Sequence, residues 1–381
     1  MKKTLLQACA LCVGATTVQA GGLDRSGQPI TLIFEDGNYA EFSVSQTNPD
    51  VTGNDLTNQN PFGTPSGNVA QDFNHVTAGI KYDIDDRLSV SLLYDQPFGS
   101  DVSYPVPSGN PNEPGSLLLG GTEAFADSDS YTGILRYKFD SNWSVHGGVR
   151  YQRLDGTIRL QGLAYGPYSG YEIDVARDGA FGWLVGAAYE RPEIALRVAL
   201  TYQSEIEHDF STTETFAFLP SQLAGAQDVK TPQSVNLDFQ TGVAPATLLF
   251  GNIRWVDHSV TQLSTTAVGM LPSAELIDLT NTTTFNLGLA HRLNENWAAS
   301  ISFGYEQEDS DDLVSPLAPT NGFKSVAVGL QYTYENVKVS GGVRYTDLGD
   351  AFAETGTPDV ARADFRDNDA VSFGIRIGYS F

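Results

Sequence analysis

Few residues of this chain have the types and spacing that chemistry requires. Its five histidines lie far apart in the sequence and form no pair at metal-ligand spacing: His75, His146, His208, His258 and His291. No Gly-x-Ser-x-Gly element is present to expose a serine nucleophile on a sharp turn. The acidic stretch from Glu306 to Asp312 has enough carboxylates for Ca²⁺ but lacks the spacing of a calcium loop. The sequence therefore predicts no catalytic residue, no metal site and no cofactor.

Arginines recur in segments where apolar and polar residues alternate, always among the polar ones. The candidates to line a common interior are Arg136, Arg150, Arg197, Arg254, Arg292, Arg344 and Arg376. A planar guanidinium can pair with a carboxylate through two hydrogen bonds, so this set could attract an anionic ligand. Pairing with interior acids such as Glu306 is the competing interpretation. Four apolar residues at the same parity either line a path for an apolar molecule or pack on one another: Ile134, Leu184, Leu248 and Phe250.

Two segments rich in turn-forming residues are too apolar to meet only water. Segment 209–230 contains Phe210, Phe216, Phe218, Leu219 and Leu223. Segment 98–121 contains Leu117, Leu118 and Leu119, which would form the opposite wall. Together they predict a groove that captures a hydrophobic ligand. Contact with neighbouring loops or with lipid headgroups is the alternative.

The elements that must position these residues are β-strands. Segment 371–381 alternates apolar with small or polar residues, and so do segments 143–152, 297–306 and 337–346. Period two with one apolar face is the pattern of a strand. Tight turns and long loops alternate between such segments. The sequence predicts fourteen strands, near 29–46, 68–83, 86–97, 122–140, 142–155, 171–190, 193–208, 231–244, 246–258, 281–293, 296–307, 323–335, 337–348 and 368–381.

An even strand number, with short turns at one end and long loops at the other, is typical of an antiparallel transmembrane β-barrel of a bacterial outer membrane. Backbone groups in lipid must be satisfied internally, and a closed barrel achieves this with strands. The apolar parity supplies a lipid-facing band, and rings near the strand ends supply aromatic girdles. A secreted β-sandwich or solenoid is the competing fold. Regular hairpins without a Greek-key crossover or a fixed repeat fit it poorly.

Composition excludes other classes of protein. The chain has 381 residues, with 46 acidic against 22 basic side chains and a formal net charge of −24. Such a surface does not neutralise phosphates, so no nucleic-acid partner is expected.

Lys2 and Lys3, an apolar run and the Val18–Ala20 element predict a signal peptide over residues 1–20, cleaved after Ala20. Both cysteines lie inside it, so the mature chain holds no disulfide.

Three segments carry a family resemblance. One joins Gly22–Gln28 to Leu32–Glu41, another runs from Thr231 to Pro245 and closes on Arg254–Trp255, and the third is the last strand, ending at Phe381. In these segments the chain resembles the long-chain fatty-acid transporter family of outer-membrane barrels, the FadL type. The resemblance implies fourteen strands, an N-terminal hatch inside the lumen, capture of hydrophobic molecules by the outer loops, and exit through a gap in the wall. It also implies that the barrel-assembly machinery reads Phe381.

The N-terminus departs from this family. About eight residues, 21–28, precede the first predicted strand, and no Asn-Pro-Ala element occurs there. The sequence therefore predicts a short plug at 21–28 followed by a barrel at 29–381.

The resulting hypothesis is an outer-membrane channel for passive uptake of hydrophobic compounds, with long-chain fatty acids as the favoured ligand. The expected partners are outer-membrane lipids, lipopolysaccharide and a hydrophobic small molecule. A general diffusion porin with a wide polar lumen is the main alternative. An outer-membrane hydrolase is a weaker one, since one sequence cannot show which side chains meet across strands.

Overall fold

A computed structural model describes residues 23–110, 113–269, 271–277, 279–308, 312–356 and 359–381. The predicted signal peptide and its cleavage site lie outside these ranges. No helix among the described residues is long and apolar enough to cross a membrane.

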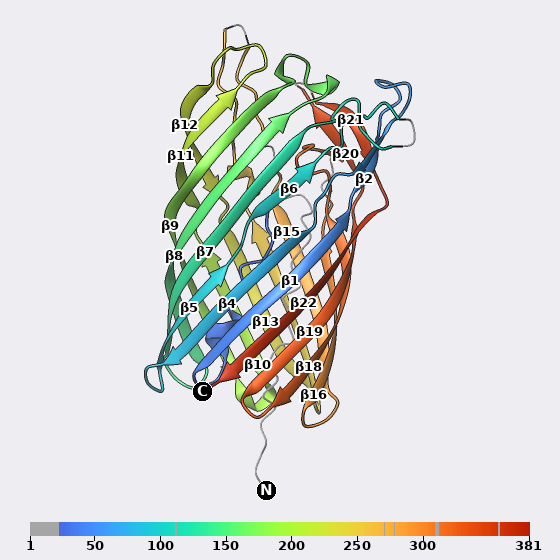
Figure 1. Ribbon diagram of the computed structural model, residues 1–381. Helices are drawn as coiled ribbons and strands as arrows, with labels where there is room; N and C mark the ends of the chain where they lie inside the picture. The colour runs from blue at the N-terminus through green and yellow to red at the C-terminus, as the bar shows by residue number, and fades with distance from the viewer. Residues whose placement is uncertain (1–22, 111–112, 270, 278, 309–311, 357–358) are drawn as a thin grey trace.

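The fold is a closed antiparallel barrel, as the alternation predicts (Figure 1). Each strand pairs with the next along the chain, and β1 pairs with β22 from Tyr39↔Ser380 to Asp50↔Asp369 to close the wall. Three of the fourteen wall strands are each built from two consecutive pieces, β5 with β6, β10 with β11, and β12 with β13. The wall comprises β1 (Tyr39–Asp50), β4 (Phe73–Asp83), β5 (Leu88–Asp95), β6 (Gly99–Ser103), β7 (Glu123–Lys138), β8 (Trp143–Leu160), β9 (Tyr171–Arg191), β10 (Leu196–Gln203), β11 (Ile206–Thr215), β12 (Leu223–Thr231), β13 (Ser234–Ala244), β14 (Thr247–Val256), β15 (Thr282–Arg292), β16 (Trp297–Glu306), β18 (Phe323–Tyr334), β19 (Val337–Leu348) and β22 (Asn368–Ser380).

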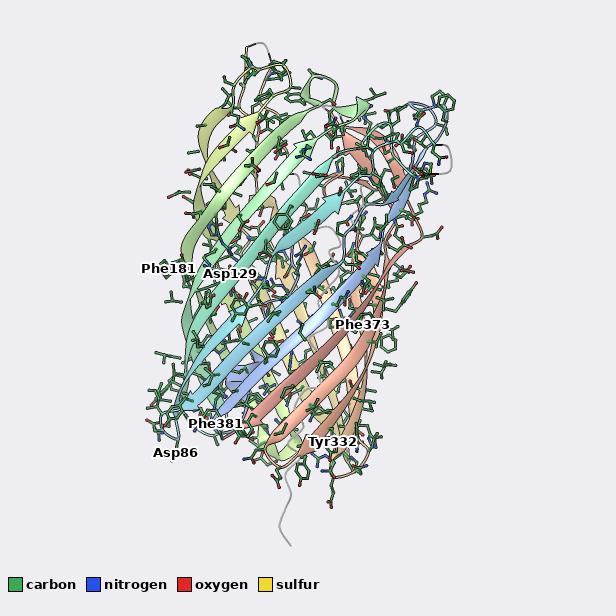
Figure 2. All side chains as sticks on the ribbon, in the orientation of Figure 1. Asp86, Asp129, Phe181, Tyr332, Phe373 and Phe381 are labelled. Carbon is green, nitrogen blue, oxygen red and sulfur yellow. The ribbon has the colours of Figure 1, made fainter. Side chains whose placement is uncertain are left out.

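The outer face of the wall carries apolar and aromatic side chains. Phe181 and Phe373 point away from the barrel (Figure 2) and are 71% and 45% exposed. Ring pairs gather toward the short-turn end, as with Trp143 on Tyr189, and again toward the loops, as with Tyr151 on Phe181. An apolar band between two aromatic girdles is the surface that a bilayer requires.

The short turns at one end use a repeated side-chain cap. Asp140 accepts backbone hydrogen bonds from Asn142 and Trp143 at 2.7 and 2.8 Å. Asp85 accepts two such bonds in the preceding short turn, and Asn294 does so in a later one. Because these bonds favour the charged carboxylate, they lower the pKa of Asp85 and Asp140.

The long loops at the other end fold into a cap (Figure 1). A small sheet orders β17 (Leu313–Val314), β20 (Ala351–Thr355), β21 (Val360–Phe365), β2 (Thr52–Asp55) and β3 (Pro65–Asn68). Asp55, the buried last residue of β2, accepts bonds from the backbone of Leu117 and Leu118 and from the hydroxyls of Ser116 and Thr64. This buried carboxylate ties two loops together.

Several predicted strand bounds differ from the structure, and the two largest differences have a physical cause. The first strand begins at Tyr39 instead of residue 29, because the apolar residues Ile30, Ile33 and Phe34 pack inside the barrel around the 3-10 turn η1 (Thr31–Phe34). Segment 209–230, expected as a loop, continues as β11 and β12 well beyond the predicted strand ends. Turn-forming residues there lie on an exposed extension of the wall, where their low strand propensity is overridden by cross-strand pairing.

Candidate ligand pocket and lumen plug

The segment that precedes β1 fills the lumen and is held there by the wall. Arg254 of β14 donates to Asp24 at 2.5 Å, to Asn236 at 2.7 Å and to Ser234 at 3.0 Å. Asn236 and Gln203 donate to the backbone carbonyls of Gly27 and Gln28. We call the described residues 23–38 the plug. A charge-assisted bond inside a buried network is stronger than a neutral one, so Arg254 is its main anchor.

The plug is clamped again near the short-turn end. The ring of Phe34 lies between two guanidinium groups, with Arg136 Cζ 4.5 Å and Arg197 Cζ 4.7 Å from the ring centroid. Arg136 also donates to the carbonyl of Ile33 at 3.3 Å and pairs with Glu190. Lys338 pairs with Glu35 at 2.8 Å. Side chains from β7, β10 and β19 thus hold the same short turn of the plug.

The wall is broken next to the plug, between β5 and β6. Both strands pair with β7, but the five residues from Asp95 to Gly99 face the four from Ser130 to Asp127, which is a bulge. On the other side, β4 pairs with β5 only from Ala78↔Tyr94 onward. The backbone of 97–99 turns inward and pairs with the plug instead, through Arg25 N to Pro97 O at 2.8 Å and Gly99 N to Leu23 O at 3.0 Å.

An apolar cavity of about 90 Å³ lies beside this break, under the loop cap. Leu23 of the plug and Ser100 of β6 line the side next to the break. The wall and the long loops contribute the rest of the lining. Its apolar lining comprises Leu23, Ala124, Phe125, Ala126, Leu154, Ile158, Val175, Phe210, Val229, Leu263, Ile277, Leu279, Leu317 and Ala318.

The charged residue in the cavity lining is acidic. Asp155 is part of its lining, and the lining residues include no arginine, lysine or histidine. Arg177 lies 3.5 Å from Asp155 but also pairs with Asp129 on the outer wall. Burial lowers the pKa of Arg25 in the neighbouring plug, and the carboxylates of Asp127 and Asp101 oppose that shift. A neutral apolar molecule suits such a cavity better than a carboxylate does.

The predicted lumen residues all lie at the inward parity of their strands. The most buried are Ile134, Arg136, Arg150, Leu184, Leu248, Phe250, Arg254 and Arg344, whereas Arg197, Arg292 and Arg376 are partly exposed. Arg136, Arg197 and Arg254 contact the plug, an arrangement that neither sequence-based interpretation of the arginines included. Ile134 and Leu184 pack with the plug residues Ile30, Ile33 and Phe34, while Leu248 and Phe250 form a separate cluster.

The predicted capture residues lie in the loop cap and on the wall strands β11 and β12, and divide into three groups. Leu118, Leu119, Phe210 and Phe216 belong to one buried cluster, against which Leu219 and Leu223 pack. Leu117 and Phe218 are 39% and 54% exposed. Among these residues the cavity lining includes Phe210. The structure therefore brings most of them together as the core of the cap, and their role in capture stays a prediction.

Sequence reasoning missed most of the cavity. Leu263, Ile277, Leu279 and Leu317 come from long loops at 259–280 and 308–322, whose apolar residues were the available signal. Val175 and Val229 stand at inward positions of β9 and β12. Their common cavity depends on how loops distant in sequence fold over the barrel, which periodicity does not encode.

Polar contacts in the lumen include histidine–carboxylate pairs. His75 lies 3.0 Å from Asp95, to which Ser26 also donates, and His208 lies 3.1 Å from Asp178. Within the described ranges, no serine hydroxyl is hydrogen-bonded to a histidine ring, as a serine hydrolase would need. The carboxylates of Glu207, Asp209 and Asp228 lie together on the exposed outer wall, where acidic groups are common without a metal.

Comparison with known proteins identifies the family. Residues 27–381 match the family described as outer membrane protein transport protein (OMPP1/FadL/TodX). The chain belongs to this family. Its members are outer-membrane transport proteins, which places the chain in the bacterial outer membrane and in a non-enzymatic class. No curated protein matches the chain in sequence.

Solved structures agree on the fold of this family member. A Pseudomonas aeruginosa FadL homologue superposes with a TM-score of 0.73 at 15% identity, covering 97% of this chain and 100% of that one. The toluene transporter TodX of P. putida gives a TM-score of 0.64 at 12% identity, with 93% and 92% covered. The Ralstonia pickettii toluene transporter TbuX gives 0.61 at 13% identity, with 97% of each chain covered.

Proposed function

We propose that this protein is a passive outer-membrane channel for hydrophobic compounds, and that small neutral molecules such as monocyclic aromatics are its best ligands. The observation that carries the proposal is the apolar cavity between the plug, the broken wall and the loop cap. An apolar cavity can bind a ligand such as benzene without polar groups. Two relatives named as toluene transporters support the same ligand class.

Long-chain fatty acids, the ligand favoured from the sequence, differ from such molecules in their length and their carboxylate. The apolar lining suits part of an acyl chain. The carboxylate would find Asp155 in the lining and no basic partner there. Burying an unpaired charge is costly, so we propose that fatty acids bind more weakly than neutral compounds of similar width.

The route that we propose runs from the loop cap into the cavity and then sideways through the wall. The cavity already adjoins the break between β5 and β6. The straight route through the lumen is filled by the plug and opens on the short-turn side into a polar hollow of about 450 Å³, lined by Arg136, Lys138 and Glu190. An apolar molecule gains nothing from that hollow, whereas the membrane interior dissolves it.

The same proposal sets the location and partners of the chain. We propose export with cleavage after Ala20, contact of the apolar band with outer-membrane lipids and lipopolysaccharide, and recognition of Phe381 by the barrel-assembly machinery. The exposed apolar side chains on the outer wall support the lipid contact. Phe381 is half-exposed at the end of β22, within reach of another protein.

A cavity-filling variant tests this function. Val229 is 6% exposed and lines the cavity, so Val229→Trp should reduce uptake of ¹⁴C-labelled toluene to the level of cells without the channel. The control Val243→Trp makes the same change on the outer wall, at a residue that is 53% exposed, and should leave uptake unchanged. Normal uptake by a folded Val229→Trp protein would contradict the cavity route.

Conductance separates this function from the porin alternative. In planar lipid bilayers the wild-type protein should show little steady conductance, because the plug fills its lumen. A large, constant open pore would instead favour a diffusion porin.

A further inference from the structure

The side chain of Arg25 occupies the break in the wall. Its guanidinium lies over the ring of Phe73, with Cζ 4.4 Å from the centroid, and the residue is 8% exposed. Phe73 is the first residue of β4, in the stretch that has no ladder partner on the side of β5. Arg25 therefore lies between the start of β4 and the junction of β5 and β6, where these strands do not pair.

Gly99 leaves the space that this side chain needs. A Cβ atom built on Gly99 would lie 2.5 Å from Cζ and Nη1 of Arg25, closer than any real contact allows. The backbone around Gly99 is fixed by its bond to Leu23, so the guanidinium and a larger residue at position 99 cannot share the site. The absence of a side chain at 99 is thus a steric requirement of Arg25 at this place.

Arg25 is held more weakly than Arg254 and Arg136. Arg254 and Arg136 each make charge-assisted bonds to carboxylates, but Arg25 Nε has no hydrogen-bond partner among the described residues. The acidic side chains whose charges act on it are Asp127 and Asp101, at outward parity beyond the wall. A stacked, incompletely bonded guanidinium can move toward those acids without leaving a buried charge unpaired.

We propose that Arg25 is the latch of the lateral passage: its guanidinium closes the break on Phe73, and an apolar ligand leaves the cavity when the guanidinium moves aside. This inference rests on the proposed function, since it assigns a residue to the exit of that route. The cavity reaches the break at Leu23 and Ser100, which are close in sequence to Arg25 and Gly99, so the latch lies next to the cavity. An aromatic ligand can take the place of the guanidinium on the ring of Phe73.

Uptake of ¹⁴C-labelled toluene by cells that lack their own channel of this family tests the latch. Arg25→Ala should raise the initial uptake rate about fivefold, the factor that corresponds to a cation–π contact of about 1 kcal/mol. Gly99→Ala keeps Arg25 but displaces it, and should act in the same direction. Both proteins must run as folded barrels in unheated gel samples.

A matched control lies elsewhere on the wall. Arg153 also stacks on a ring, at 5.7 Å from the centroid of Tyr131, but it faces outward and away from the break. Arg153→Ala should take up toluene at the wild-type rate. Rates for Arg25→Ala and Gly99→Ala that equal or fall below wild type, with wild type active, would overturn the latch alone. Wild-type uptake no greater than that of cells without the channel would overturn the proposed function.

Discussion

At the scale of single residues, the lumen contains ionisable groups that the plug shields from water. His258, in the 3-10 turn η4 (His258–Val260) just after β14, is 1% exposed. Burial lowers the pKa of His258 to about 4; the charge of Arg254 acts in the same direction, and those of Asp24 and Asp257 oppose it. The neutral imidazole is therefore the form that the folded cap accepts.

This shift predicts a pH dependence of stability. The unfolded chain binds a proton at His258 near pH 6.5, while the folded chain does so only near pH 4. Between those values the unfolded state holds more protons, so the free energy of unfolding falls as the pH drops from 6.5 to 4, by at most about 3 kcal/mol. His258→Gln should lose part of this drop when denaturation in detergent is measured at pH 7 and pH 4. The exposed His291 is the control, and an equal drop in His258→Gln and His291→Gln would refute the assignment.

At the scale of elements, the plug is the part that decides whether the lumen conducts. The turn η1 places Phe34 between Arg136 and Arg197, and these contacts come from β7 and β10, on different parts of the wall. Removing the ring leaves two guanidinium groups facing an empty space. Buried Phe→Ala changes cost about 3–5 kcal/mol, enough to release a short segment from its seat.

Phe34→Ala should therefore give current steps in planar bilayers where the wild-type protein is nearly silent. Phe42→Ala is the matched control, because Phe42 is 50% exposed on the outer face of β1. Silent recordings from a folded Phe34→Ala protein would show that Arg254 and the remaining plug contacts suffice to close the lumen.

The sequence predicted the strands better than the plug for a physical reason. Wall strands have one face in lipid, so their period is visible residue by residue, and the last strand was predicted at 368–381 against Asn368–Ser380 observed. Residues 30–34 are apolar because they pack inside the lumen, and a short apolar run there looks the same as a strand. The sequence showed that the arginines share the inward-facing positions of their strands. It did not show which residues they contact, because Asp24 and Phe34 lie far from those arginines along the chain.

At the scale of the whole molecule, acidic, basic and apolar side chains occupy different regions. The lipid-facing band is apolar, Arg136, Arg197 and Arg254 face the lumen and hold the plug, and acidic groups gather in turns, loops and the outer extension of the wall. A net charge of −24 is compatible with a membrane protein because little of it lies in the band. The cavity depends on this sorting, since it lies beneath an apolar cap and its lining includes no basic residue.

The sorting predicts a depth-dependent cost for a charge on the outer wall. Leu287 lies in the middle of β15 and is 50% exposed, although the residue faces no water in a bilayer. Leu287→Arg should lower the free energy of unfolding by about 2–4 kcal/mol, whereas Thr283→Arg, opposite Trp255 at the level of a girdle, should cost about 0–1 kcal/mol. Urea unfolding in lipid vesicles measures both. Equal costs at the two depths would mean that this face does not cross the hydrocarbon core, because an exposed arginine in water is indifferent to its height on a strand.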